Sequence, residues 1–425
     1  MANLSAELYL HGELIGELIS NGTASKVTFS EDYLKNDNRK TLSLSIIDGN
    51  PDKIELFSNP DAPLPPFIQL LLPEESPLRE RILDESGMVI DQYGFSADAY
   101  ILMVTGHDLP GALEVRNVKT NGVYDDFRNE IHAPNKSQRR YFSSLSGVQD
   151  KFSLKRRKGK FIIPASNENG DFILKPQPLS GRYSTIAVNE YFHMNLAQLC
   201  GLNTPEIGIV ENDYLKEVGG EHESKSNING ISFYVRRFDR EDGAKIHMEE
   251  IFQAIKLSGR ITPDSKYNDF TLVEVLSFLN KVSNYYEVDL IDGYMKELCF
   301  SILTGNSDFH IKNSAILYKN GIKPEKAPSY DLVNAELYGY NHFALKLSDM
   351  LGEVCICDFD NKLYLEILKE VGIEQRFKHL LKKTKADIIE NIELALSDEV
   401  FQKYSTPEFR HSLKMFYRNK GLYDS

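Results

Sequence analysis

An aspartate and an asparagine stand five residues apart in the segment 304–313, as Asp308 and Asn313, and an apolar run flanks this segment on each side. Enzymes that transfer a phosphoryl group use such a pair. The aspartate orients the attacking hydroxyl and accepts its proton, and the asparagine supplies an oxygen ligand to Mg²⁺. A second carboxylate ligand is expected downstream, and Asp331 stands 23 residues after Asp308. The spacing predicts Asp308 as the catalytic residue, with Asn313 and Asp331 as magnesium ligands.

Phosphoryl transfer also needs a lysine that holds the phosphates, a helix glutamate that holds this lysine, and a turn whose backbone N–H groups cover the phosphates. The Gly/Ser-containing segment 144–151 is the candidate turn, Lys175 the candidate lysine and Glu190 its partner. Each has a simpler interpretation taken alone, because a lysine at a strand end and an acidic residue early in a helix are usually solvated. Their occurrence together, in this order along the chain, favours the phosphoryl-transfer interpretation.

Two further residues of the loop have alternative interpretations. His310 either packs in the core or belongs to the active site. Lys312 either reaches the transferring phosphate or is solvated. The basic run 155–160 is most simply a solvated hairpin turn, and a docking site for phosphate or an acidic protein is the alternative.

The chain has 425 residues, 41% of them hydrophobic, and a formal net charge of −13. This length allows two or three cores and predicts a multi-lobed protein. The acidic balance argues against a chain that coats nucleic acid by itself, although a basic partner could bring it to DNA. The amino terminus does not resemble a signal peptide, and no apolar run approaches the ~18 residues of a membrane span, so we expect a cytoplasmic protein.

The cysteines show no zinc-binding spacing, and we expect buried thiols in a reducing compartment. The side chains of the segment 355–357 are expected to alternate between the two faces of a strand. The four cysteines are Cys200, Cys299, Cys355 and Cys357.

Hydrophobic periodicity predicts a β-rich first half and a helical second half. Expected strands cover a hairpin at 7–18 and the segments 26–29, 41–46, 152–154, 172–175, 206–210 and 231–235. Expected helices cover 67–72, 78–82, a helix capped by Ser184 or Thr185 and closed by Gly201, and then 249–257, 270–286, 289–304, 363–371, 376–396 and 407–420. A polar linker from 117 to 140 predicts a boundary near residue 120.

Several of these blocks resemble the signature segments of the HipA toxin kinases. They are the segment 144–151 (SLSGVQDK), 173–175 (ILK), 189–191 (NEY), 235–240 (VRRFDR), 305–313 (GNSDFHIKN) and 330–332 (YDL). The resemblance extends to 72–74 and 106–113 and so covers nearly the whole chain. It implies a protein-kinase-like, two-lobed α+β fold. The expected domains are an amino-terminal subdomain (1–120), a β-rich small lobe (121–243) and a helical large lobe (244–425).

The family resemblance implies a serine/threonine-protein kinase toxin of a type II toxin–antitoxin module, dependent on ATP and Mg²⁺. Its target would be an aminoacyl-tRNA synthetase, typically the glutamyl enzyme, whose phosphorylation arrests growth. A HipB-type helix-turn-helix antitoxin would neutralise the kinase and carry it to DNA, without any membrane. Ser144 would be the autophosphorylation site, with Ser146 as an alternative, and a phosphate there would repel ATP. The implied ATP-binding residues are Ser146, Gly147, Val148, Gln149, Asp150, Lys151, Lys175, Glu190, Arg236, Arg237, Phe238, Asp239, His310, Ile311, Lys312, Asn313 and Asp331.

Two other functions remain open at this point. A small-molecule kinase would use the same base and metal residues. A binding module could keep the fold mainly to hold an antitoxin on DNA as a corepressor, although such a module has no chemical need for Lys175, Asp308, Asn313 and Asp331 together.

Overall fold

The computed structural model of the chain describes residues 3–46, 56–73, 79–80, 98, 101–102, 105–106, 109–121, 151–162, 164, 170–212, 230–241 and 243–423. These residues belong to two compact units that alternate along the sequence. Unit 1 consists of Met1–Asp171, Arg237–Ser265 and Ile316–Pro324, and unit 2 of Phe172–Arg236, Lys266–Ala315 and Glu325–Ser425. The consecutive domains with bounds at residues 120 and 243 that the sequence suggested stay a prediction.

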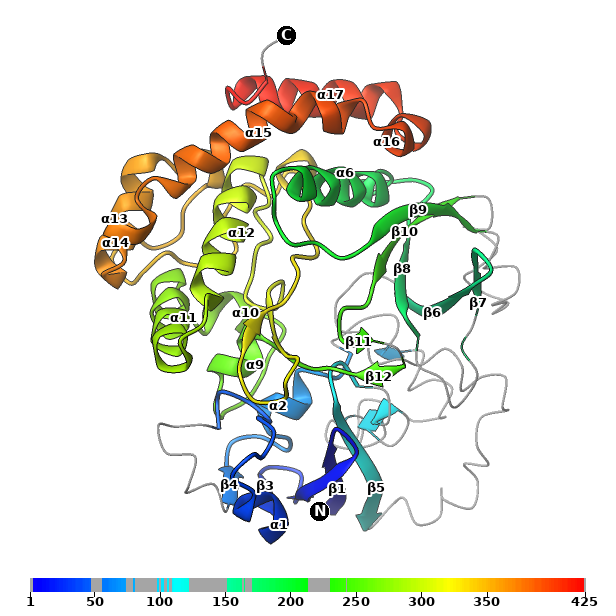
Figure 1. The fold of residues 1–425 in the computed structure, drawn as a ribbon, viewed down its shortest axis with the longest axis vertical. Helices are drawn as coiled ribbons and strands as arrows, with labels where there is room; N and C mark the ends of the chain where they lie inside the picture. The colour runs from blue at the N-terminus through cyan, green and yellow to red at the C-terminus, as the bar shows by residue number, and fades with distance from the viewer. Residues whose placement is uncertain are drawn as a thin grey trace. The chain divides into compact units, whose positions relative to one another are not determined.

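Unit 1 is built on an antiparallel sheet in the order β4-β3-β2-β1-β5 (Figure 1). The strands are β1 (Asn3–Leu10), β2 (Glu13–Ser20), β3 (Ser25–Phe29), β4 (Leu56–Asn59) and β5 (Leu113–Asn121). The predicted hairpin at 7–18 is confirmed, and its turn consists of His11 and Gly12, both with positive φ. Alternate strand residues such as Leu4, Ala6 and Leu8 are buried in a core formed by residues 4–115 of this unit.

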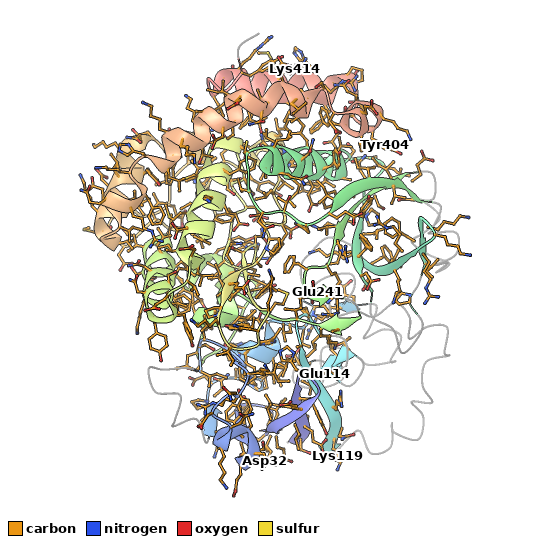
Figure 2. The ribbon with its side chains drawn as sticks, viewed as in Figure 1. Asp32, Glu114, Lys119, Glu241, Tyr404 and Lys414 are labelled. Atoms are coloured by element: carbon orange, nitrogen blue, oxygen red, sulfur yellow. A yellow bond between two sulfur atoms is a disulfide. The ribbon has the colours of Figure 1, made fainter. Side chains whose placement is uncertain are left out.

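The rest of unit 1 consists of short elements. They include α1 (Glu31–Lys35), α2 (Pro66–Gln69), β6 (Phe152–Arg157), β7 (Lys160–Ile162), β11 (Arg240–Glu241), β12 (Ala244–Lys245), β13 (His247–Glu250) and α9 (Ile251–Ile255). The strand β14 (Ala315–Tyr318) belongs to this unit from Ile316 onward. The basic run 155–160 forms the β6–β7 hairpin, whose turn residues Lys158 and Gly159 have positive φ. Glu114 and Lys119 on β5 are labelled in Figure 2.

The strand predicted at 41–46 is wrong. These residues form a turn whose polar groups bind other parts of unit 1 instead of a neighbouring strand. The Thr41 N–H donates to the Gly321 carbonyl at 2.8 Å, and the Leu44 N–H donates to the Glu249 carboxylate at 2.9 Å. Because these bonds satisfy the backbone, the segment needs no ladder partner.

The sheet strands of unit 2 are antiparallel in the order β8-β10-β9, with helix α6 packed beside them. They are β8 (Phe172–Pro176), β9 (Ile207–Glu211) and β10 (Ile231–Arg236), and α6 spans Ile186–Leu199. The strands at 172–175, 206–210 and 231–235 were predicted, as was the helix, which follows Thr185 and ends before Gly201 in the left-handed conformation. Its residues Val188, Phe192 and Leu196 enter the core of the unit.

The helices of unit 2 are α10 (Ser265–Asn268), which begins at the unit boundary, α11 (Leu272–Tyr286), α12 (Leu290–Thr304), α13 (Asn361–Val371), α14 (Glu374–Phe377), α15 (Leu380–Leu396), α16 (Glu399–Tyr404) and α17 (Pro407–Asn419). Strand β15 (Glu325–Lys326) and the 3₁₀ turns η5 (Glu336–Tyr338) and η6 (Ile356–Asp358) complete it. Side chains cap several helix starts, as Thr271, Asp360, Asp398 and Thr406 do for α11, α13, α16 and α17. Figure 1 shows α15, α16 and α17 beside α6, and Figure 2 labels Tyr404 and Lys414 on α16 and α17.

Two helix boundaries differ from the prediction. The segment 249–257 begins as strand β13, and α9 starts only after Glu250, which forms a capping box with Gln253. The segment 376–396 divides into α14 and α15. At the end of α14, the Phe377 carbonyl accepts a hydrogen bond from the Tyr364 hydroxyl at 2.9 Å. Among the described residues, no helix combines the length and the apolar character needed to cross a membrane.

The cysteine predictions need correction at one place. Cys299 is a buried thiol and Cys200 a half-buried one, but Cys355 and Cys357 are joined by a disulfide and Cys357 is exposed. The predicted strand at 355–357 is also wrong, because the chain enters η6 at Ile356. Residues two apart on a strand point to the same face with Cα atoms roughly 6.6 Å apart, whereas the turn here brings the Cα atoms of Cys355 and Cys357 to 5.3 Å.

Candidate functional site

Helix α12 delivers the chain into the predicted catalytic loop. The helix ends at Gly305, whose φ of +75° reverses the chain, and the Gly305 carbonyl accepts the backbone N–H of Ala335 at 2.9 Å. From residue 304 to residue 318 every residue is buried except Asp308, which is exposed. The fold therefore presents one carboxylate to solvent from an otherwise buried loop.

Asn313 closes the loop on Asp308. Its side-chain amide donates to the backbone carbonyl of Asp308 at 2.9 Å, and its backbone N–H donates to the His310 carbonyl at 2.9 Å. With its –NH₂ group engaged in this way, the oxygen of the Asn313 amide is the atom that suits a hard cation.

Lys175, Glu190 and Asp331 meet in the same unit. The Lys175 Nζ lies 2.6 Å from Glu190 Oε1 and also forms an ion pair with Asp331 Oδ1. Lys175 is 4% exposed and Glu190 2% exposed, so neither is the solvated surface residue that was the simpler interpretation. Burial alone lowers the pKa of Lys175, but the carboxylates of Asp331 and Glu190 outweigh this effect and raise it. The lysine is therefore a fixed cation.

A further hydrogen bond links the loop to the Asp331 segment. The Tyr330 hydroxyl donates to the Lys312 carbonyl at 2.8 Å. Tyr330 precedes Asp331 and Lys312 precedes Asn313, so this bond joins the neighbours of the two predicted magnesium ligands. Asp331 itself has a φ of +55°, which is uncommon for a residue other than glycine.

Asn189 plays a part that sequence reasoning did not find. Its amide donates to the Asn334 carbonyl and accepts the Asn334 N–H, both at 3.0 Å, and both residues are fully buried. Asn189 precedes Glu190 on α6, and Asn334 follows Asp331 by three residues. This pair of bonds holds α6 and the segment after Asp331 together, and the two carboxylates that pair with Lys175 stand next to these bonds in the chain. The sequence signal for Asn189 is its place in the signature segment 189–191, next to Glu190.

Tyr267 was also not predicted, although it contacts the exposed carboxylate. Its hydroxyl donates to Asp308 Oδ1 at 3.2 Å, and its ring meets the His310 ring edge-on with centroids 5.3 Å apart. His310, Ile311 and Lys312 are all buried within the loop. The structure therefore places His310 in the loop core beside Tyr267.

The predicted nucleotide-binding residues at 236–239 divide between the units. Arg236 ends β10 in unit 2 and is exposed, while Arg237, Phe238 and Asp239 belong to unit 1. Asp239 is 3% exposed, and its carboxylate accepts Arg237 Nε at 2.9 Å, Arg240 Nη1 at 2.7 Å and the Gly111 N–H at 2.9 Å.

Burial alone would raise the pKa of Asp239, but the two guanidinium groups lower it well below its usual range. This ion-pair cluster accounts for the burial of Asp239, and the ribose contact that the resemblance implies stays a prediction. Lys151 is described and half-buried, whereas Ser144 and the predicted phosphate-covering residues Ser146, Gly147, Val148, Gln149 and Asp150 lie outside the described residues.

The paired lysine, the exposed aspartate and the neighbouring asparagine, carried on a mixed helix-and-sheet scaffold, define a kinase-like α+β protein. Sequence profiles of two domains match the chain, the HipA N-terminal domain at residues 6–116 and the HipA-like C-terminal domain at residues 143–392, which is more than half of the chain. The chain belongs to the HipA family, as its motifs predicted.

Individual relatives agree with this assignment. The protein named "Putative kinase Y4dM" of Sinorhizobium fredii is 30% identical over 339 residues, covering 78% of this chain and 77% of that protein. The "Serine/threonine-protein kinase toxin HipA" of Shewanella oneidensis is 24% identical over 349 residues, covering 79% of this chain and 76% of that protein. A solved structure of the Shewanella oneidensis HipA, HipB and operator DNA complex matches with a TM-score of 0.66 at 20% identity, covering 98% of this chain and 96% of that one. The predicted fold class is confirmed.

Proposed function

We propose that this protein is an ATP-dependent serine/threonine-protein kinase that uses Mg²⁺. The observation that carries the proposal is the exposure of Asp308 alone within a buried loop that also holds Asn313. A carboxylate presented in this way can accept a proton from a group that arrives from solvent, as the hydroxyl of a protein substrate would. The kinase names of the relatives support the proposal.

Each residue has a role that follows from its surroundings. Asp308 orients the acceptor hydroxyl and takes its proton. Lys175, held by Glu190, provides a permanent positive charge for the phosphates of ATP, and it must exchange its contact with Asp331 for the nucleotide. Asn313 and Asp331 supply oxygen ligands of the type that Mg²⁺ prefers. When bound, the metal ion would neutralise charge on the phosphates.

The family context extends the proposal to a toxin–antitoxin module. A helix-turn-helix antitoxin of the HipB type is the proposed partner, because the matching Shewanella structure contains HipA, HipB and operator DNA. With a net charge of −13, this chain would reach DNA through that partner. The proposed target is an aminoacyl-tRNA synthetase, and the proposed setting is the cytoplasm. Ser144 is the proposed autophosphorylation site, with Ser146 as the alternative.

The proposed reaction is tested by phosphate incorporation. The purified chain is incubated with Mg²⁺ and ATP, and phosphoserine and phosphothreonine are mapped by mass spectrometry. We expect phosphate at Ser144 or Ser146 in the parent and none in Asp308→Asn. Asp349→Asn is the control, because Asp349 is exposed on the same unit. Full phosphate transfer by Asp308→Asn would show that the assignment is wrong.

A further inference from the structure

The surroundings of Asp308 restrict how a substrate can approach it. Since its loop neighbours are buried, the carboxylate can be reached only from its exposed side. The Tyr267 hydroxyl already lies 3.2 Å from Asp308 Oδ1, which shows that a hydroxyl on a protein side chain fits against this carboxylate. Whatever carries the acceptor hydroxyl must therefore rest on the other exposed groups around Asp308.

Exposed aromatic side chains of unit 2 provide such a surface next to the loop. Tyr183, just before α6, is 38% exposed, and Tyr340, just after η5, is 47% exposed. Their hydroxyl groups are hydrogen-bonded to each other. The guanidinium carbon of Arg182 lies 4.5 Å from the centre of the Tyr340 ring, and Arg182 also donates to the Tyr338 carbonyl. We call Arg182, Tyr183 and Tyr340 the tyrosine platform.

The platform is fixed to the catalytic loop. The Ser307 hydroxyl donates to the Tyr340 carbonyl at 2.5 Å, and Ser307 directly precedes Asp308. The pKa of Tyr183 is raised, first by its hydrogen bond with Tyr340 and, among smaller causes, by the negative charge of Asp308. Tyr183 thus lies within electrostatic range of the catalytic carboxylate. A ligand seated on the platform would lie beside Asp308.

We propose that the tyrosine platform docks the polypeptide segment that carries the acceptor serine or threonine. This inference rests on the proposed function and specifies its substrate class as an exposed segment of a protein. Residues 339–342 and 181–183 are all exposed, so the surface is open, whereas small-molecule sites enclose most of their ligand. Tyrosine and arginine are enriched at protein interfaces, where a few such side chains carry most of the binding energy. Tyr183 and Tyr340 act as positioning residues, since they touch the polypeptide and not the transferred phosphate.

The test separates polypeptide docking from phosphate chemistry. Full-length parent, Tyr183→Ala/Tyr340→Ala and Tyr183→Phe/Tyr340→Phe are compared. The acceptor probe is total bacterial protein that has been treated with phosphatase and then heat-inactivated. Each kinase variant is incubated with this probe, radioactive ATP and Mg²⁺, and the label transferred to protein is measured. Binding of a fluorescent ATP analogue and ATP hydrolysis without acceptor protein report on the nucleotide site. Tyr285→Ala is the matched control, because Tyr285 is 62% exposed on α11 of the same unit.

We expect the double alanine variant to label protein at least about tenfold more slowly at low acceptor concentration. Its nucleotide binding and ATP hydrolysis should stay within about twofold of the parent. The double phenylalanine variant, which keeps both rings, should retain most of the labelling, and Tyr285→Ala should match the parent.

Two results would overturn the inference while leaving the proposed function intact. One is unchanged protein labelling by the double alanine variant. The other is an equal loss of labelling and nucleotide binding, which would show that the tyrosines only support the fold of the site. A parent protein that binds ATP but labels no protein would instead overturn the proposed function, and this inference with it.

Discussion

Two buried ionisable residues of this protein lie in opposite electrostatic surroundings. Lys175 in unit 2 is paired with two carboxylates, whereas the Glu249 carboxylate in unit 1 is held by neutral donors: Ser43 Oγ at 2.6 Å, the Leu44 N–H at 2.9 Å and the Tyr318 hydroxyl. Desolvation favours the neutral form of a buried acid unless a cation compensates for it. We therefore expect a substitution of Lys175 to leave buried charges unpaired, and we expect Glu249 to make stability depend on pH.

Replacing Lys175 should separate its structural role from its functional one. Lys175→Met leaves the Glu190 and Asp331 carboxylates without the buried cation that pairs them, and we expect a loss on the order of 3 kcal/mol in the free energy of unfolding. Lys175→Met/Glu190→Gln should recover part of this stability, because it also removes one buried charge. Neither variant should bind nucleotide as the parent does. Urea unfolding and titration with a fluorescent ATP analogue would measure the two effects, and parent-like nucleotide affinity in Lys175→Met would contradict the assigned role.

Glu249 should make stability depend on pH near neutrality. Burial raises its pKa to about 7, despite the hydrogen bonds from Ser43, Tyr318 and the Leu44 backbone, which lower it. A raised carboxyl pKa means that the folded state binds the proton more tightly. Its contribution to stability is therefore complete below about pH 4.5 and is lost as the pH rises through about 7.

The experiment compares the parent with Glu249→Gln at pH 5 and pH 8. Between these values the parent should lose on the order of 2 to 3 kcal/mol more than the variant, because glutamine does not titrate. Urea unfolding followed by circular dichroism at the two pH values gives the difference. An identical loss in both proteins would show that Glu249 does not titrate in this range.

At the scale of elements, the site depends on how α12 ends. The predicted catalytic loop begins at Gly305, which combines a positive φ with close packing. A Cβ built at this position would lie 2.7 Å from Glu336 Oε2 and from Phe416 Cζ, and 2.9 Å from Asn334 Oδ1. These neighbours come from η5, α17 and the segment after Asp331. The end of the helix therefore positions the loop against the segment that carries the second predicted metal ligand.

Gly305→Ala should lower the free energy of unfolding more than the same substitution at a glycine that has free space around it. We expect a loss of roughly 1 kcal/mol from the left-handed conformation and a further 1 to 3 kcal/mol from the close packing. Gly372→Ala is the matched control, because Gly372 ends α13 with a φ of +79° and nothing lies within 4 Å of a Cβ built there. Thermal unfolding and phosphate transfer should both decline more in Gly305→Ala. Equal effects of the two substitutions would mean that the packing around Gly305 adjusts freely.

At the scale of the whole molecule, unit 1 draws on distant parts of the chain. Among the described residues, the hydrophobic core around its five-stranded sheet is formed within residues 4–118. In contrast, the backbone of residues 41–44 and Gly111 is hydrogen-bonded to the distant residues Asp239, His247, Glu249 and Gly321. The core is therefore local in sequence, and the contacts around it are not.

A fragment of residues 1–121 tests this division. We expect it to fold around its core, because hydrophobic burial supplies most of the stability of a small domain. The Thr41, Leu44 and Gly111 amides should exchange with solvent faster than in the full chain, since their acceptors are absent from the fragment. The amides of the β1–β2 ladder should stay protected. Hydrogen exchange measured by NMR would show this, and a fragment without protected amides would contradict the prediction.

The sequence alone identified the elements whose signals are local. Alternating apolar residues predicted the β1–β2 hairpin, and the apolar stripe with its closing glycine predicted α6, because strand and helix periodicity are properties of neighbouring residues. The order of Lys175, Glu190, Asp308, Asn313 and Asp331 predicted phosphoryl-transfer chemistry, and the resemblance of the signature segments predicted the family and its kinase-like fold.

The tertiary structure determined the features that depend on residues far apart in the chain. It replaced the strand predicted at 41–46 by a turn, because the acceptor for Leu44 is the carboxylate of Glu249, more than 200 residues away. It joined Asn189 to Asn334, placed the Tyr267 hydroxyl against Asp308, and bonded Tyr340 of the tyrosine platform to Ser307. Hydrogen bonds of this kind form only after distant segments have packed together, so no pattern among neighbouring residues could indicate them.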